Sequence, residues 1–327
     1  MSARLLAVLL GLTMLGLPAP ARAADPPQLR EAHSEPGWWR PSAARPLTLH
    51  WVLGDRLDVH DPRSMGLRDH RGRKLPAPDV YDIDGELNPK STVDLLHRRG
   101  KKAICYFDAG AYETYRRDAW KFRRIEPRIW GKPDLGWNDS YWLDIRRVDD
   151  LEPIMKARMR MCKRKGFDAV EPDQIDGWEN SMHPRTHKPS AKHGLTGFPI
   201  SRRHQLRYNR ALARWAHELG LSIGQKGDLI QTRDLVSHFD WTLNEECFQF
   251  RECIRPYDPR LGKVFPGLQL YVRAGKAVFV AEYEKPRAKR WRTICRDSRK
   301  RHFNTARFEL DLPRYGRRTP CMSARDW

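Results

Sequence analysis

Short apolar runs recur along the middle of the chain, and several follow a charged, helix-like stretch that ends in glycine. Gly100, Gly166 and Gly220 each close such a stretch, and an apolar run begins directly afterwards. Glycine readily takes the left-handed conformation that ends a helix, and basic residues complement the helix C-terminus. The short runs are typical of buried parallel strands. The pattern therefore predicts helices that alternate with strands.

Eight segments qualify as strands, and helix-length segments separate many of them. They cover residues 47–53, 79–84, 101–107, 141–145, 167–173, 221–228, 239–245 and 276–283. This rhythm favours an α/β fold, a single (β/α)8 TIM-type barrel domain over residues 47–327. A doubly wound sheet is the alternative, but no GxGxxG motif follows the first strand. Residues 24–46 form an irregular, proline-rich lead-in.

The first 23 residues have the pattern of a secretory signal peptide. Arg4 precedes an apolar stretch from Leu5 to Leu17, and the small-x-small sequence Ala21-Arg22-Ala23 follows. Cleavage is expected after Ala23. The alternative is a membrane anchor, but the stretch is shorter than the roughly 20 residues that a span needs. The mature protein is therefore expected to be secreted and extracellular.

The composition indicates a folded, strongly basic protein without a membrane span. Lys and Arg number 61 against 41 Asp and Glu, which gives a net charge of +20, and mean hydropathy is -0.74. The basic run from Lys285 to Arg318 is interpreted as a solvated C-terminal extension attracted to anionic cell walls. Nucleic-acid binding is an alternative, but the basic residues form no recognition motif.

Six cysteines fit an oxidising compartment, and they allow fifteen pairings. Cys247 and Cys253 are expected to close a small loop, and Cys295 and Cys321 could hold the C-terminal tail. Cys105 lies in an apolar strand pattern and could be a buried thiol. No CxxC or HExxH motif supports a metal site, so none is expected.

Carboxylates and aromatic residues gather at the ends of the expected strands. The carboxylates are Asp82, Asp84, Asp108, Asp144, Asp173, Asp176, Glu245, Glu246 and Glu282, and the aromatic residues are Trp51, Tyr81, Tyr106, Trp142, Trp178, Trp241 and Tyr283. Two carboxylates can hydrolyse a glycosidic bond, and aromatic faces stack on sugar rings. A glycosidase is therefore predicted. The alternative is that these acids are ordinary salt-bridge partners.

An ordered set of segments resembles the endo-alpha-1,4-polygalactosaminidase family of glycoside hydrolases, from about Trp51 to Tyr283. The segments are DVYDID at 79–84, AICYFDAGAYETYRRDA at 103–119, WLDIR at 142–146, GFDAVEPDQIDGW at 166–178, QLRYNRALARWAHELGLSIGQKGD at 205–228 and FDWTLNEECFQFREC at 239–253. The resemblance implies a TIM-type barrel that hydrolyses alpha-1,4-linked galactosamine polymers without an organic cofactor.

The resemblance assigns the catalytic acids to Asp173 and Glu245. Glu245 is expected to protonate the leaving oxygen, and Asp173 to stay ionised and attack or stabilise the anomeric carbon. The roles could be exchanged. Glu246 is the adjacent alternative, although strand alternation should point it away from Glu245. Retention of configuration is the expected stereochemistry.

The expected substrate-binding residues come from several strand ends. They are Trp51, Tyr81, Asp82, Asp84, Tyr106, Asp144, Asp176, Lys226 and Glu282. Asp82, Asp84 and Asp144 could hold sugar hydroxyls or an ammonium group, or could brace the barrel instead. Lys226 could bind a substrate oxygen or hold a catalytic carboxylate ionised.

Some residues depart from the family pattern. Gln174 stands where the family has Asn, QKGD at 225–228 replaces LKND, and Asp108 replaces a small hydroxyl residue. The histidine-bearing stretch from Met182 to Gly194 is interpreted as an inserted loop over the active-site mouth.

A basic protein should repel a cationic galactosamine polymer, so an acidic mouth on a basic body is expected. The expected partners are a polysaccharide and an anionic cell wall, with no specific nucleic acid, and the protein is expected to be a monomer. A non-catalytic carbohydrate-binding barrel remains the alternative function.

Overall fold

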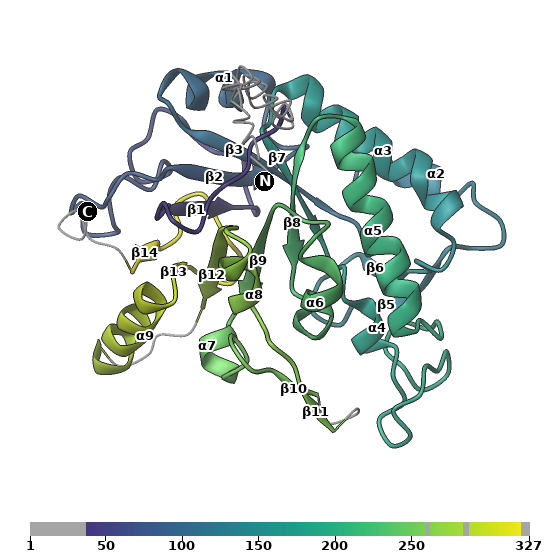
Figure 1. Ribbon diagram of the computed structural model, residues 1–327. Coiled ribbons are helices and arrows are strands. Elements are labelled where there is room, and N and C mark those ends of the chain that lie inside the picture. Colours follow the sequence, from purple (N-terminus) through teal and green to yellow (C-terminus); the bar gives the residue numbers. More distant parts are fainter. Residues whose placement is uncertain (1–36, 259–261, 284–287, 322–327) are drawn as a thin grey trace, which may run out of the picture. The chain divides into compact units, whose positions relative to one another are not determined.

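The computed structural model describes residues 37–258, 262–283 and 288–321, and within them a nearly closed barrel sheet dominates (Figure 1). The predicted signal peptide lies outside these residues. Eight strands run parallel in the order β1-β2-β3-β7-β8-β9-β12-β13, and the two-residue β14 pairs antiparallel with β13. Their bounds are β1 Leu49–Val52, β2 Val80–Asp84, β3 Lys102–Asp108, β7 Ala169–Asp173, β8 Ser222–Lys226, β9 Trp241–Glu245, β12 Val278–Glu282, β13 Phe303–Arg307 and β14 Thr319–Pro320. The predicted α/β barrel is confirmed.

Hydrogen bonds link the first barrel strand to the last. The Leu47 N–H donates to Asn304 Oδ1 at 2.8 Å, below one end of β1. At the other end, the N–H groups of Leu53 and Gly54 donate to the carbonyl of Leu312, at 3.1 and 3.2 Å. Both ends of β1 are therefore held against the chain around β13.

Helices cover the outside of the barrel, and α3 and α5 lie side by side over the strands β7 and β8 (Figure 1). The longer helices are α1 Lys90–Arg98, α3 Val148–Lys165, α5 Arg202–Glu218 and α9 Ala288–Lys300; the short ones are α2 Ala119–Phe122, α4 Gly177–Asn180, η1 Leu229–Gln231, α6 Thr232–Leu235, α7 Cys247–Phe250 and α8 Gln269–Arg273. Gly100, Gly166 and Gly220 have φ of 68°, 90° and 64°. The three predicted left-handed helix ends are confirmed.

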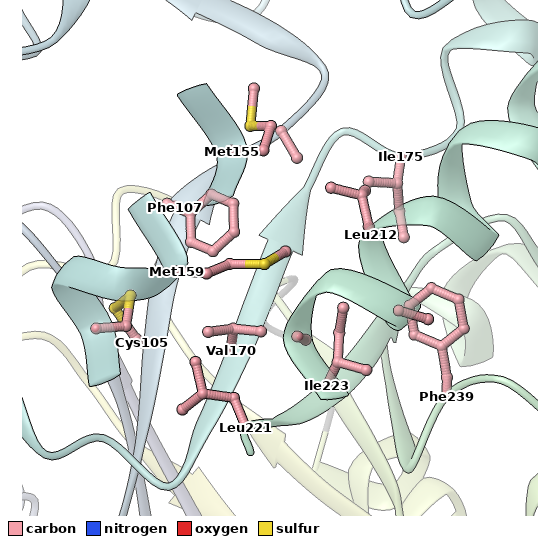
Figure 2. Packing of buried hydrophobic residues seen from close by; sticks show 14 of the residues in the cluster. Cys105, Phe107, Met155, Met159, Val170, Ile175, Leu212, Leu221, Ile223 and Phe239 are labelled. Carbon is pink, nitrogen blue, oxygen red and sulfur yellow. A yellow bond between two sulfur atoms is a disulfide. The ribbon is translucent and has the colours of Figure 1, made fainter. Parts of the chain in front are cut away.

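Two hydrophobic clusters lie on opposite faces of the barrel sheet. Alternate residues of each strand belong to different clusters: Val170 packs under α3 and α5 (Figure 2), while Ala169 joins Trp241 and Phe279 inside the barrel. Successive side chains of a strand point to opposite faces. Residues that share the alternation of Ala169, including Asp173, therefore point into the barrel.

One predicted barrel strand is wrong. The segment 141–145 contributes instead to β6, Ser140–Leu143, in a separate antiparallel sheet with β4, Ala111–Glu113, and β5, Trp130–Pro133. Only residues 134–139 join β5 to β6, which is too short for a parallel crossover. The eighth barrel strand is β13, which the apolar pattern missed because its sequence, FNTAR, is largely polar.

The basic run 285–318 therefore supplies the last helix and strand of the barrel. The polar side chains of β13 are buried through hydrogen bonds, because Asn304 Nδ2 donates to the Val278 carbonyl and Ser298 Oγ donates to Thr305 Oγ1. A further two-stranded sheet joins β10, Tyr257–Asp258, to β11, Lys263–Val264.

Three disulfides join the six cysteines. Cys247 pairs with Cys253 and Cys295 with Cys321, as predicted. The prediction of a buried Cys105 thiol is wrong, because Cys105 on β3 is bonded to Cys162 on α3. This bond fastens a covering helix to the barrel wall.

The described part of the lead-in is attached to the barrel. The Ala43 N–H donates to the Gly275 carbonyl at 3.0 Å, and the Trp38 ring stacks on His217 at 4.4 Å. Within the described residues, none of the helices combines the length and apolar character that crossing a membrane requires.

Candidate active site

Three charged side chains meet at the carboxyl ends of the neighbouring strands β7, β8 and β9. Asp173, Lys226 and Glu245 are the last residues of these strands. Lys226 Nζ lies 2.8 Å from Asp173 Oδ1 and 2.7 Å from Glu245 Oε1. These two distances add to 5.5 Å, so the two carboxylate oxygens lie no farther apart than that. The structure thus brings the two expected catalytic acids together.

Asp173 is held in its ionised form. Its Oδ1 accepts hydrogen bonds from Lys226 Nζ and the Gln174 N–H, and its Oδ2 accepts one from the Tyr106 hydroxyl at 2.9 Å. Burial alone would raise the pKa of Asp173, but the Lys226 charge and these hydrogen bonds lower it below its usual value. An ionised carboxylate suits a nucleophile.

Glu245 is the more accessible of the two acids. Its side chain is 36% exposed against 21% for Asp173, and the Tyr283 hydroxyl donates to it. The neighbouring Glu246 has a left-handed φ of 53°, and its N–H donates to the Ala281 carbonyl. Glu245 lines two hollows at this end of the barrel, and Glu246 lines neither of them.

The two acids lie where two hollows of different size meet. The large hollow has a volume of about 730 Å³ and the small hollow about 170 Å³. Asp173, Gln174 and Glu245 line both hollows, and so does Trp137. A polymer that ran from one hollow to the other would cross the catalytic pair.

The large hollow is acidic although the whole chain is basic. Seven carboxyl groups line it, and among its described lining residues Lys226 is the one lysine or arginine. The carboxyls belong to Asp173, Asp176, Glu179, Asp228, Glu245, Glu252 and Asp258. Burial, followed by the charges of Glu179 and Asp173, raises the pKa of Asp176 to about 7. The expected acidic mouth on a basic body is therefore present.

The small hollow combines aromatic rings with a fixed cation. Trp51, Tyr106 and Tyr283 line it, and the Trp51 ring lies 4.9 Å from Lys226 Nζ. Arg116 also lines it and is held by ion pairs with Glu113 and Asp84.

A family model for glycoside hydrolase family GH114 matches residues 29–323. The chain belongs to family GH114. It is similar to the crystal structure of Aspergillus fumigatus Ega3 in complex with galactosamine, with 25% identity, a TM-score of 0.66 and coverage of 85% of this chain and 96% of that one. The glycoside hydrolase domain of PelA from Pseudomonas aeruginosa shares the fold at 13% identity, with a TM-score of 0.53 and coverage of 82% and 96%. No curated protein matches the chain significantly.

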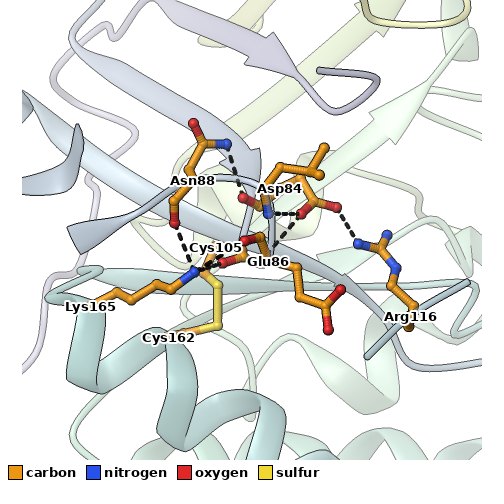
Figure 3. Close-up of a disulfide and its surroundings, with 9 residues drawn as sticks. Asp84, Glu86, Asn88, Cys105, Arg116, Cys162 and Lys165 are labelled. Atoms are coloured by element: carbon orange, nitrogen blue, oxygen red, sulfur yellow. Dashed lines mark hydrogen bonds and ion pairs between the residues drawn. A yellow bond between two sulfur atoms is a disulfide. The ribbon is translucent and has the colours of Figure 1, made fainter. Parts of the chain in front are cut away.

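The family predicted from the sequence is confirmed, and the chain is a galactosaminidase-like glycoside hydrolase. Of its expected substrate-binding residues, Trp51, Tyr106, Asp176 and Lys226 line the hollows of this GH114 enzyme. Asp84 stands behind the small hollow, where it accepts hydrogen bonds from Arg116 and from the N–H groups of Glu86 and Leu87 (Figure 3).

Four other expected residues lie outside the hollows of the GH114 site. Tyr81 points away from the barrel interior and donates to the Met65 carbonyl, while Glu282 accepts from the Phe248 N–H. Asp144 lies beyond the end of β6 and pairs with Arg146. Asp82 points inward but is completely buried.

Sequence reasoning missed Glu171, whose Oε1 lies 3.2 Å from Lys226 Nζ. Glu171 stands two residues before Asp173 on β7, and residues at this spacing share one face of a strand. That spacing was the signal that could have identified it.

The residues that depart from the family pattern lie close to the catalytic pair. Gln174 lines both hollows, and its buried Oε1 accepts no hydrogen bond from the described residues. Asp108 Oδ1 accepts from the N–H groups of Gly110 and Ala111, which shapes the turn after β3.

The stretch from Met182 to Gly194 borders the large hollow of the GH114 barrel through Met182, His183 and His187. His183 Nδ1 accepts from the N–H groups of Arg185 and Thr186, which shapes the loop locally. The described residues contain no group of three or more His, Cys, Asp or Glu side chains that could hold a metal ion.

Proposed function

We propose that this GH114 hydrolase cleaves alpha-1,4-linked galactosamine-containing polysaccharide by a two-carboxylate mechanism. The observation that carries the proposal is the contact of Asp173 and Glu245 with the same ammonium group of Lys226, at the junction of the two hollows. Retaining glycosidases place their carboxyl groups about 5 to 5.5 Å apart, and inverting enzymes about 6.5 to 9.5 Å. The limit of 5.5 Å supports retention.

In the mechanism, Asp173 attacks the anomeric carbon while Glu245 protonates the leaving glycosidic oxygen. The C–O bond of the linkage breaks, and a covalent bond forms between the sugar and Asp173. Glu245 then takes a proton from water, which attacks the anomeric carbon and releases Asp173. Lys226 keeps Asp173 ionised for the first step.

A cationic amino sugar fits the large hollow. Carboxylates such as Asp176 and Glu179 can pair with ammonium groups at short range, where the net positive charge of the remote surface is largely screened. Ega3, crystallised with galactosamine, supports the same substrate class. The local charge thus favours a substrate that the whole molecule would repel.

The proposal includes secretion of a monomeric enzyme with cleavage after Ala23, residues 24–46 as lead-in and the hydrolase domain from 47 onward. Three disulfides support folding in an oxidising compartment, and a single chain forms both catalytic acids and both hollows. Exposed cations on α9, including Arg292 and Lys300, would hold the enzyme on an anionic cell wall.

Hydrolysis assays with paired variants test the proposal. Galactosaminan, glucosaminan and neutral galactan are incubated with wild-type enzyme, Asp173→Asn, Glu245→Gln and the matched control Glu246→Gln, and new reducing ends are counted. Wild type and Glu246→Gln should cleave galactosaminan, and the other two should lose roughly a thousand-fold or more in kcat. Activity that survives both Asp173→Asn and Glu245→Gln would refute the site.

A further inference from the structure

Two more carboxyl groups lie inside the barrel next to Lys226. Asp82 on β2 and Glu171 on β7 are both completely buried and line neither hollow. Apart from each other and the Lys226 ammonium, 3.2 Å from Glu171 Oε1, the described residues offer these four carboxyl oxygens no hydrogen-bond donor. Since a sugar cannot reach these oxygens, the pair needs a role other than substrate binding.

Lys226 contacts Glu171 but not Asp82, and two ionised carboxylates would repel each other strongly in a buried site, which favours a proton held by the pair. Burial, and then the charge of Glu171, raises the pKa of Asp82 well above its usual value. Burial also raises the pKa of Glu171, while Lys226 and a hydrogen bond with Asp82 oppose that rise. Because Glu171 Oε1 is the oxygen next to the Lys226 ammonium, the charge is favoured on Glu171 and the proton on Asp82.

The single charge of the pair lies next to the lysine of the catalytic centre. Lys226 Nζ is 3.2 Å from Glu171 Oε1 and also contacts both catalytic acids. Burial opposes the charge of Lys226, but the three carboxylates raise its pKa well above its usual value. The groups that face it are Trp51 on β1, Glu171 and Asp173 on β7, Glu245 on β9 and Tyr283 after β12, and its charge also acts on Asp82 of β2 and on Asp176 after β7.

We propose that Asp82 and Glu171 are positioning residues that share one proton and present one negative charge, which holds the Lys226 ammonium between Asp173 and Glu245. This inference rests on the proposed function, because it assigns the pair to the same catalytic centre. The pair acts through Lys226 and touches no substrate.

The two members of the pair differ in what their replacement changes. Glu171→Gln removes a negative charge beside Asp173 and Lys226, and so lowers the pKa of Asp173 further. Asp82→Asn preserves the neutral state of that side chain, and its amide can still donate to Glu171. The two amide variants therefore separate a shared-proton pair from two independent structural acids.

The first test is the pH profile of kcat/KM on galactosaminan. We expect Glu171→Gln to move the acid limb, which reports Asp173, by about one unit toward lower pH and to reduce kcat at nearly unchanged KM. Asp82→Asn should keep both limbs within a few tenths of a unit. Glu171→Gln with wild-type limbs, or Asp82→Asn with the same shift as Glu171→Gln, would overturn the proposal.

The second test does not depend on turnover. Infrared difference spectra at neutral pH should show that Asp82→Asn removes one protonated-carboxyl C=O band. The control Asp240→Asn should leave this band in place, because Asp240, at the opposite end of the barrel, accepts hydrogen bonds from the Ile223 N–H and the Trp38 indole. If Asp82→Asn removes no such band, the shared proton is refuted. A wild-type enzyme without glycan hydrolysis would refute the proposed function and leave this result standing.

Discussion

At the scale of single residues, Lys226 is the cation that pairs with both acids of the catalytic centre. Its ammonium contacts both proposed catalytic acids, and the Trp51 ring covers it. A lysine with 8% of its side chain exposed needs such partners, because an unpaired buried charge is costly. Its contacts keep Asp173 ionised and align the two acids.

Replacing Lys226 by methionine tests this role. We expect Lys226→Met to reduce kcat by roughly 100-fold, since a pre-organised charge is lost from the site. The pKa of Asp173 should rise without the ammonium, so the acid limb of the pH profile should move to higher pH. The measurement is kcat/KM against pH.

Lys165→Met is the matched control for that variant. Lys165 Nζ donates to the Gly85 and Asn88 carbonyls (Figure 3). Its loss should lower stability and leave the pH profile in place. An unmoved acid limb in Lys226→Met would contradict the proposed link to Asp173.

Asp176 gives the large hollow a pH dependence near neutrality. Its pKa is raised to about 7, so its carboxylate forms as the pH rises through that value and then attracts a cationic sugar. We expect KM for galactosaminan to fall between about pH 6 and 8 more steeply in wild type than in Asp176→Asn. The titration of the substrate is common to both enzymes, so equal slopes would exclude this role for Asp176.

The sequence predicted which residues lie at the strand ends, but it did not predict how deeply each side chain is buried. Asp173, Lys226 and Glu245 each close an apolar run, and strand alternation directs them inward. The sequence alone did not separate Asp82, which is sealed inside the barrel, from Asp176, which lines the large hollow. Burial depends on which strands become neighbours, and that is a property of the whole sheet.

At the scale of elements, β7, β8 and β9 place the three charged groups, and disulfides fasten covering segments to the barrel. The bond between Cys105 and Cys162 closes 57 residues, and the bond between Cys247 and Cys253 closes 6. Longer closed loops restrict the unfolded chain more strongly.

Removing the two disulfides separately should reveal that difference. The double variant Cys105→Ala/Cys162→Ala should lose about 4 kcal/mol of unfolding free energy, and Cys247→Ala/Cys253→Ala about 2 kcal/mol, from loop-closure entropy. Urea titration of each oxidised protein measures both values. A larger loss for the short loop would show that native contacts, and not chain entropy, dominate.

Glycine-terminated helices and apolar strands were predictable because each signal is local. The segment 141–145 forms a strand as expected, but local pattern does not specify whether that strand joins the barrel. The polar strand β13 carries little hydrophobic signal, since its Asn304 and Thr305 are buried through hydrogen bonds. The sequence pattern therefore predicted most of the strands, but it did not predict which strands pair with one another in the barrel sheet.

At the scale of the whole molecule, acidic and basic groups are segregated. Carboxylates concentrate in the large hollow, and the exposed face of α9 carries Lys289, Arg292 and Lys300 among other cations. Net charge was predictable from composition, whereas its separation into a mouth and a surface depends on the fold.

Neutralising those three α9 cations to glutamine tests the wall-binding role. The triple variant should bind polygalacturonate beads at least roughly ten-fold more weakly at low salt, because each basic residue near an anionic surface adds about 1 kcal/mol. Its kcat on soluble galactosaminan should stay unchanged. Depletion from the supernatant measures the binding.

An equal change of charge on another face is the control. Arg160→Gln, Arg164→Gln and Arg203→Gln neutralise three exposed cations on α3 and α5. This variant should bind the beads nearly as well as wild type. Equal losses in both triple variants would assign bead binding to net charge and not to α9.

Proton NMR of a fresh galactosaminan digest tests most directly whether Asp173 and Glu245 act as a closely spaced nucleophile and acid pair. The limit of 5.5 Å on their oxygens predicts retention, so the new reducing ends should appear first as the α-anomer and mutarotate later. Reducing ends that appear first as the β-anomer would contradict the proposed mechanism.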